Sequence, residues 1–152
     1  VNAQIDPQHQ IYASYDAGYI AYKTGWKIVD LQGLTTPEVM HQNIGQVLAE
    51  KNPTVLIVAT SAFTDPSAIM LHSQYQPNPE PIPANYRFVK HLPLTNQYWW
   101  GGLEYSYYIF VNENANAALI AGLEGISIDA RQAMGYQRYL YGVLERLSRL
   151  RF

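Results

Sequence analysis

The chain has 152 residues, of which 48% are hydrophobic and 14% charged, with a formal net charge of −2 and no cysteine. This length predicts a single domain, residues 1–152, with enough chain to bury a core. The lack of cysteine excludes disulfides, thiolate metal sites and thiol nucleophiles, and the lack of a basic stripe argues against a nucleic-acid partner. No apolar run approaches the ~20 residues that a membrane-spanning helix needs.

The first predicted elements form a strand–helix–strand unit in residues 11–34, around which the rest of the chain is arranged. Ile11–Ser14 is typical of a short strand, Tyr19–Lys23 of a helix of one or two turns, and Lys27–Leu31 of a second strand. Gly25 stands where a helix commonly ends in a left-handed residue. Two short strands joined through a helix pair in parallel, with a right-handed crossover.

A longer helix and a buried strand are predicted next. Residues 36–38, Thr-Pro-Glu, are a strong helix start, and Lys-Asn-Pro at 51–53 is a strong stop. Apolar residues between them recur at helical spacing: Val39, Met40, Ile44, Val47 and Leu48. Thr54–Ala59 is continuously apolar and β-branched, as expected of a central parallel strand covered on both faces.

Residues 61–85 predict a long excursion over the surface, with one short helix within 67–75. Four prolines occupy alternate positions: Pro77, Pro79, Pro81 and Pro83. Proline favours extended polyproline-like chain and disfavours both helix and sheet, so we expect neither in this stretch. Loops of this length are uncommon unless they are functional or mobile.

The last third predicts an antiparallel strand pair and two helices. Tyr86–Leu92 and Tyr105–Val111 alternate as strands do, and the aromatic, glycine-containing residues 98–102 form the turn between them. Asn114 caps a short helix, and Asp129 caps the last one. The predicted fold is therefore α/β: a small, mainly parallel three-layer sheet of strand order 2-1-3 with helices on both faces, extended by an antiparallel strand pair.

Two patterns near the start carry a family resemblance. Residues 16–25 read Asp-Ala-Gly-x-Ile-Ala-Tyr-x-Thr-Gly, and residues 28–38 read Ile-Val-Asp-Leu-x-Gly-Leu-Thr-x-Pro-Glu. Together they resemble the soluble, extracytoplasmic C-terminal region of GT-C class membrane glycosyltransferases, the arabinofuranosyl-, mannosyl- and aminoarabinose-transferase-like enzymes that use lipid-linked phosphosugars. In that group the catalytic aspartates lie in loops between membrane helices, so the resemblance carries no catalytic residue over to this chain.

The resemblance implies a non-catalytic accessory domain, periplasmic or cell-surface, in a larger membrane-tethered glycosyltransferase. Such a domain would position a glycan acceptor or a lipid-linked donor, or pack over the catalytic membrane part. The implied partners are the membrane-embedded part of the same polypeptide and a glycan or polyprenyl-phosphate sugar, with no cofactor. Because the chain begins at Val1 without an initiator methionine, we expect either a processed product or, in line with the resemblance, a segment excised from a larger membrane protein.

Five residues are candidate ligand-binding residues: Asp16, Tyr22, Asp30, Trp99 and Trp100. Asp16 and Asp30 follow neighbouring predicted strands, so their carboxylates are expected to face one cleft beside Tyr22 and to bond sugar hydroxyls. The alternative is structural: Asp16 caps a helix, and Asp30 supports the next loop. Trp99 and Trp100 offer ring faces to a sugar or a membrane interface, or else they cover the sheet edge or the core.

Two further functions are open on the sequence. One is a free-standing carbohydrate-binding module that uses the aromatic turn. The other is a small hydrolase or transferase that uses Asp16, Asp30 or Ser61, although Ser61 lacks the G-x-S-x-G nucleophile elbow. The four histidines lack metal-binding spacing, and no G-x-G-x-x-G dinucleotide motif is present, so the sequence predicts no metal ligand, cofactor site or catalytic residue.

Overall fold

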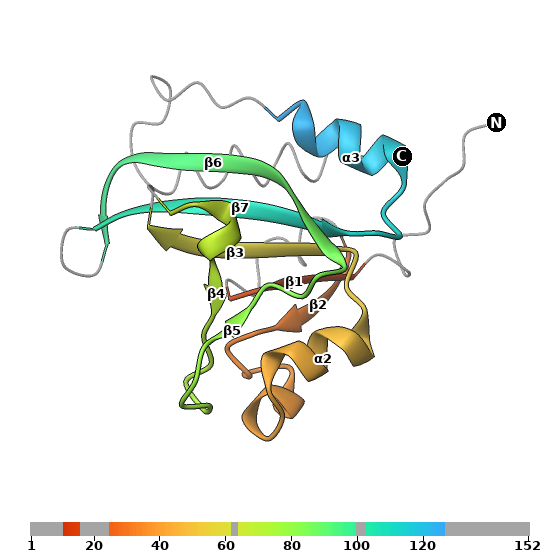
Figure 1. Cartoon of the computed structure of the whole chain (residues 1–152), viewed down its shortest axis with the longest axis vertical. Coiled ribbons are helices and arrows are strands. Elements are labelled where there is room, and N and C mark those ends of the chain that lie inside the picture. Colours follow the sequence, from red (N-terminus) through yellow and green to blue (C-terminus); the bar gives the residue numbers. More distant parts are fainter. Residues whose placement is uncertain (1–10, 16–24, 62–63, 100–102, 127–152) are drawn as a thin grey trace.

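The main sheet of the protein has five strands. The computed structural model describes residues 11–15, 25–61, 64–99 and 103–126. In these residues the sheet contains β1 (Ile11–Ser14), β2 (Lys27–Asp30), β3 (Val55–Ser61), β6 (Tyr86–Trp99) and β7 (Leu103–Asn112). They lie side by side in the order β2-β1-β3-β7-β6 (Figure 1).

The predicted α/β class is confirmed, but the sheet is not mainly parallel. β1 pairs in parallel with both β2 and β3, whereas β7 is antiparallel to both β3 and β6. The order therefore contains the predicted 2-1-3 arrangement. Two strand pairs, β1–β2 and β1–β3, are parallel, and two, β3–β7 and β6–β7, are antiparallel. Such a hairpin forms readily because its two strands follow one another along the chain.

β3 is central, as its sequence predicted. Its side chains alternate between two buried clusters, with Val55 and Ile57 on one face and Leu56 and Val58 on the other. All four are at most 6% exposed. A strand that is covered on both faces has no solvated side, which is why its sequence is continuously apolar.

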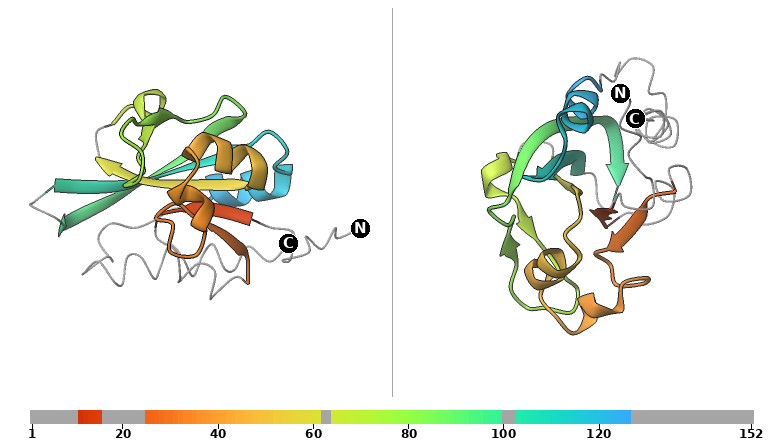
Figure 2. Two further views of the ribbon diagram at one scale, coloured as in Figure 1. Left: turned by 90° about the horizontal axis from the view of Figure 1, so that it is seen from below. Right: turned by 90° about the vertical axis from the view of Figure 1, so that its right-hand side faces the viewer.

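Among the described residues, one α-helix covers each face of the sheet. α2 (Ile44–Lys51) buries Ile44, Val47 and Leu48 in one cluster. α3 (Ala117–Glu124) buries Leu119 and Leu123 in the other. The right-hand view of Figure 2 shows the two helices apart, with strands of the sheet between them.

The predicted helix over residues 36–51 is divided into a short 3-10 helix, η2 (Pro37–Met40), and α2. Asn43 causes the division: it has extended backbone angles, and its side chain accepts a hydrogen bond of 2.9 Å from the Gln46 amide, so it caps a new helix. The predicted stop is confirmed, because Asn52 is left-handed with φ 46°. α3 likewise begins after Asn116, two residues later than predicted.

The proline-rich excursion contains a second, two-stranded sheet, which the sequence prediction excluded. After the 3-10 helix η3 (Pro66–Ala68), β4 (Met70–Leu71) pairs antiparallel with β5 (Glu80–Pro81). The expectation that proline forbids any ladder was wrong here, because both strands of a two-stranded sheet are edges and need not donate on their outer sides. For the same reason β6, the edge strand of the main sheet, runs beyond its predicted end at Leu92 and through Pro93.

Several expectations concern residues outside the described ranges: the helix Tyr19–Lys23 and the last helix from Asp129 both lie there. At the edge of the first gap, Gly25 has φ +70°, the left-handed geometry predicted for it. Tyr98 and Trp99, predicted to lie in the turn, are instead the last residues of β6 and pair with Glu104 and Leu103, while residues 100–102 lie outside the described ranges.

Candidate functional site

The side chain of Asp30 is wholly buried at the end of β2, where it fixes the loop that follows. Its Oδ1 accepts a hydrogen bond from the Gln32 amide at 2.9 Å. Its Oδ2 accepts from the Thr35 amide at 2.9 Å and from the Thr35 hydroxyl at 3.3 Å. The Asp30 amide donates to the Thr36 hydroxyl oxygen at 2.9 Å, so Thr36 supports this loop and does not cap η2.

We name residues 31–35 the Asp30 loop; its tip is apolar. Gly33 takes the left-handed φ of +81° that the turn requires, and its amide donates to the Asp30 carbonyl at 3.0 Å. The next residue, Leu34, is 83% exposed, the most exposed of the large hydrophobic residues in the described part of the chain. The loop therefore holds an apolar side chain outward on a hydrogen-bonded base.

The Asp30 loop is braced by residues 72–80, which we name the strap. The amide of Gln74's side chain donates to the Gln32 carbonyl at 3.1 Å. The ring of Tyr75 lies so close to Gly33 that a Cβ at position 33 would be 3.0 Å from it. The strap also reaches β1, because the His72 backbone amide donates to the Tyr15 hydroxyl at 2.9 Å. Burial raises the pKa of Tyr15 to about 12, so this hydroxyl stays protonated at neutral pH.

Glu80 joins the end of the strap to α2. Its Oε1 accepts from the Ile44 amide at 2.8 Å and its Oε2 from the Gly45 amide at 3.1 Å. The two amides belong to the first turn of the helix, where they have no partner within the helix and where the dipole favours an anion. A Cβ at position 45 would be 2.7 Å from Glu80 Oε2, so a larger residue there would shift this carboxylate from its present contact.

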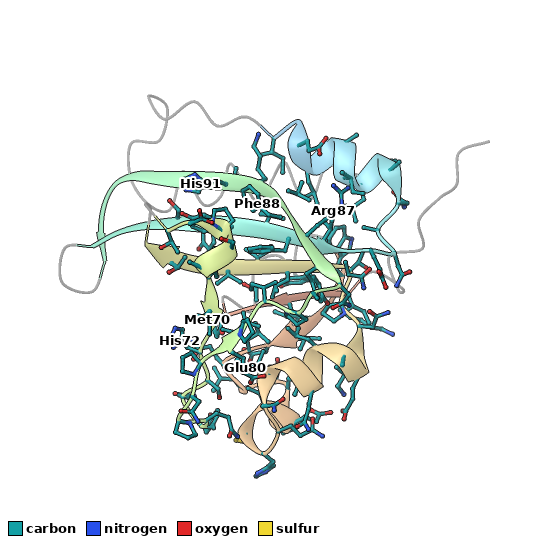
Figure 3. The ribbon with its side chains drawn as sticks, viewed as in Figure 1. Met70, His72, Glu80, Arg87, Phe88 and His91 are labelled. Atoms are coloured by element: carbon teal, nitrogen blue, oxygen red, sulfur yellow. The ribbon has the colours of Figure 1, made fainter. Side chains whose placement is uncertain are left out.

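A second group of polar and aromatic residues lies on β6 and β7. The imidazole of His91 stacks on Tyr108 with ring centroids 4.6 Å apart, and Phe88, 40% exposed, packs edge-on against Phe110 at 5.7 Å. Figure 3 shows Phe88 and His91 on β6. His91 Nε2 and Ser106 Oγ are buried without a hydrogen-bond partner. Burial lowers the pKa of His91, because the charged imidazolium loses its hydration there.

The structure places only part of the predicted binding set. Asp16, Tyr22 and Trp100 lie outside the described residues, so the predicted convergence of Asp16 and Asp30 in one cleft stays a prediction. For Asp30, the geometry is that of the structural alternative, in which the carboxylate supports the loop. The backbone of Trp99 ends β6, opposite Leu103.

Three residues that sequence reasoning missed are central here: Tyr15, Leu34 and Glu80. Leu34 carried a usable signal, since an apolar residue in a Gly- and Thr-containing loop has no periodic partner to pack against. Glu80 carried none, because its partners are 35 and 36 residues away.

Metal and membrane features were sought among the described residues alone. No group of three or more His, Asp or Glu residues there is placed to hold a metal ion. Likewise, within those ranges, no helix combines the length and the apolar character required to cross a bilayer.

Comparison with known proteins identifies one family. No curated protein and no solved structure matches the chain. One family model matches residues 1–110, a stretch that includes the Asp30 loop, the strap and most of the β6–β7 hairpin. The chain therefore belongs to the family described as Domain of unknown function (DUF8728).

Proposed function

We propose that this chain is a non-catalytic, extracytoplasmic accessory domain of a lipid-phosphosugar-dependent membrane glycosyltransferase. It packs on the membrane-embedded catalytic part of the same polypeptide and helps to position the glycan acceptor. The parallel strands, in the order 2-1-3 with helices on both faces, are the unit that carries the contact loop, and the β6–β7 hairpin extends this unit. The proposal is supported by the resemblance of residues 16–38 to the C-terminal region of such enzymes. It is also supported by the structure of residues 28–38, where Asp30 is buried and Leu34 is exposed.

The observation that carries the proposal is the exposed Leu34 on a fixed base. The pattern's aspartate, Asp30, is buried and engaged with the loop amides, so in this state its oxygens are not offered to a substrate. What the pattern presents to the outside is a leucine that is 83% exposed. Burying such a side chain contributes about 1.5–3 kcal/mol, and a loop that is already ordered loses little entropy on binding. These properties suit a contact with another part of a protein better than they suit catalysis.

The test is to locate the polypeptide in cells that express the gene, with an antibody raised against this chain. We expect a band well above the 17.3 kDa of the chain, retained in carbonate-washed membranes and degraded by protease added to the extracytoplasmic side. A polypeptide of about the chain's own mass in the cytosolic fraction would contradict the proposal. Loss of glycosyl transfer on replacing Leu34 by Asp in the full-length enzyme would identify the contact.

A second candidate is a free-standing carbohydrate-binding module. It is favoured by the aromatic residues Tyr98 and Trp99, whose backbones end the long strand β6. Titration of cell-wall or polyprenyl-linked glycans into the wild type, Trp99→Ala and Trp100→Ala would test it, with Tyr75→Ala as an aromatic control elsewhere. Equal binding by all four proteins would exclude the aromatic turn as the binding site.

The third candidate, a small hydrolase or transferase that uses Asp16, Asp30 or Ser61, has the least support. Ser61 is the last residue of β3, opposite Tyr105, and Asp30 is taken up by its loop. Turnover of a substrate by the chain on its own, lost on replacing Ser61 or Asp16, would revive it.

A further inference from the structure

We infer that the strap, residues 72–80, opens as a unit without unfolding of the domain, and that the carboxylate of Glu80 is the latch that holds it closed. One consequence argued below, that opening makes the Asp30 loop a less rigid contact surface, rests on the proposed function. The opening itself does not depend on it.

The strap lies over the ends of two parallel strands. Tyr15 directly follows β1, and its hydroxyl accepts from the His72 amide. Gln32 follows β2, and its carbonyl accepts from the side chain of Gln74. The carboxyl ends of parallel strands are where α/β proteins most often bind other molecules, so a segment across them controls the access to this edge.

The strap has little holding it apart from polar contacts. None of its nine residues is buried: six are exposed by at least a third and the other three are half-buried. The buried side chains that anchor the excursion to the core, Ile69 and Leu71, precede the strap, and Ile82, which packs on the same cluster, follows it. Segments with few buried apolar contacts open at a lower free energy than the core, so the strap can lift between two fixed ends.

Glu80 is the strongest of the polar contacts. It is the only acidic residue in the strap, and each of its oxygens accepts from one amide of the first turn of α2. Figure 3 shows its side chain beside this helix. Hydrogen bonds to an ionised acceptor are stronger than neutral ones, and the dipole of the helix adds to them. Loss of this contact removes the side-chain anchor of the strap, while the backbone pairing of Glu80 with Leu71 still fixes its second end.

Opening would remove the brace from the Asp30 loop. The Tyr75 ring, which packs on Gly33, and the Gln74 hydrogen bond to Gln32 both belong to the strap. The hydrogen bonds of Asp30 belong to the loop itself and would survive. Leu34 would therefore keep the hydrogen bonds beneath it and lose the contacts from the strap. The loop would expose the same residue whether the strap is closed or open, but it would be more rigid when the strap is closed.

The experiment is hydrogen exchange of backbone amides in the isolated chain, with the His72 amide as reporter. Glu80→Ala removes both hydrogen bonds that the carboxylate accepts, and the milder Glu80→Gln leaves one acceptor oxygen. The control, Asn43→Ala, removes a different cap of the same helix and leaves the strap contacts in place. We expect exchange at His72 to become at least about fivefold faster in Glu80→Ala, with amides of β3 unchanged. Asn43→Ala should accelerate Gln46 and leave His72 unchanged.

Three results would overturn the inference. A His72 amide that exchanges at the wild-type rate in both Glu80 variants would show that Glu80 is not the latch. Equal acceleration of His72 and β3 would show that the strap opens only when the domain unfolds. Equal acceleration of His72 by Asn43→Ala would show that Glu80 only caps a helix. If Glu80→Ala does not fold, Glu80→Gln decides by the same criteria. Because the measurement uses the chain alone, its outcome is separate from that of the membrane-location test.

Discussion

Replacing Asp30 by Asn separates the structural role of this residue from a binding role. The carboxylate is wholly buried and accepts from two backbone amides and one hydroxyl. Asparagine has nearly the same shape but offers one oxygen, so one backbone amide is left facing an NH2 group. Hydrogen bonds to charged groups contribute about 1.5–3 kcal/mol each, and we therefore expect a loss of about 2–3 kcal/mol in the free energy of unfolding.

The assay is urea unfolding followed by tryptophan fluorescence, with Asp65→Asn as the matched control. Asp65 also accepts from a backbone amide and a hydroxyl, both of Ser67, but it is exposed, so its replacement should change the free energy of unfolding by less than about 0.5 kcal/mol. The midpoint should fall in Asp30→Asn with an unchanged slope. If Asp30→Asn were no less stable than Asp65→Asn, the loop would not depend on this carboxylate, and Asp30 would again be a candidate for binding a ligand.

Three further outcomes follow from particular contacts. Gly45→Ala should lower stability by about 1–2 kcal/mol in urea unfolding, because its Cβ would be 2.7 Å from Glu80 Oε2; a more stable variant, as helix propensity alone predicts, would contradict the Glu80 contact. Burial lowers the pKa of His91 below the usual 6.5, so the unfolded chain binds a proton there more readily than the folded one. The free energy of unfolding should therefore be highest above about pH 6.5 and should decrease as the pH falls below it. In unfolding midpoints measured from pH 7.5 to 5, His91→Phe should make this decrease smaller. Leu34→Asp should change unfolding by less than about 0.5 kcal/mol, because the side chain is 83% exposed, and a larger loss would show that Leu34 packs within the domain.

Local signals predicted most of the elements. Ile11–Ser14 is a strand with the predicted bounds, and Val55–Ser61 overlaps the predicted central strand, because β-branched and apolar runs of this length favour a buried strand whatever surrounds them. The stop at Asn52 and Pro53 was equally local, since a left-handed residue followed by proline cannot continue a helix.

The parts that were missed depend on competition or on distant residues. The break between η2 and α2 arises because two cap signals, Thr36-Pro37 and Asn43, compete within one apolar pattern, and spacing alone does not rank them. Pro81 in a ladder and Pro93 in β6 follow from edge positions, which are known only once the strand order is known. The contact of Glu80 with α2 joins residues 36 apart, so no local pattern predicts it.

The same contacts bear on the candidate functions at the carboxyl ends of β1 and β2. In the described residues, three sets of polar groups near this edge already have internal partners. The Tyr15 hydroxyl accepts from His72, the Asp30 carboxylate from its own loop, and the first amides of α2 are taken by Glu80. A catalytic or sugar-binding site needs such groups free or held by water, because a ligand has to replace the partners that it displaces. While the strap is closed, the described part of this edge therefore offers the apolar side chain of Leu34, and these polar groups stay engaged within the domain.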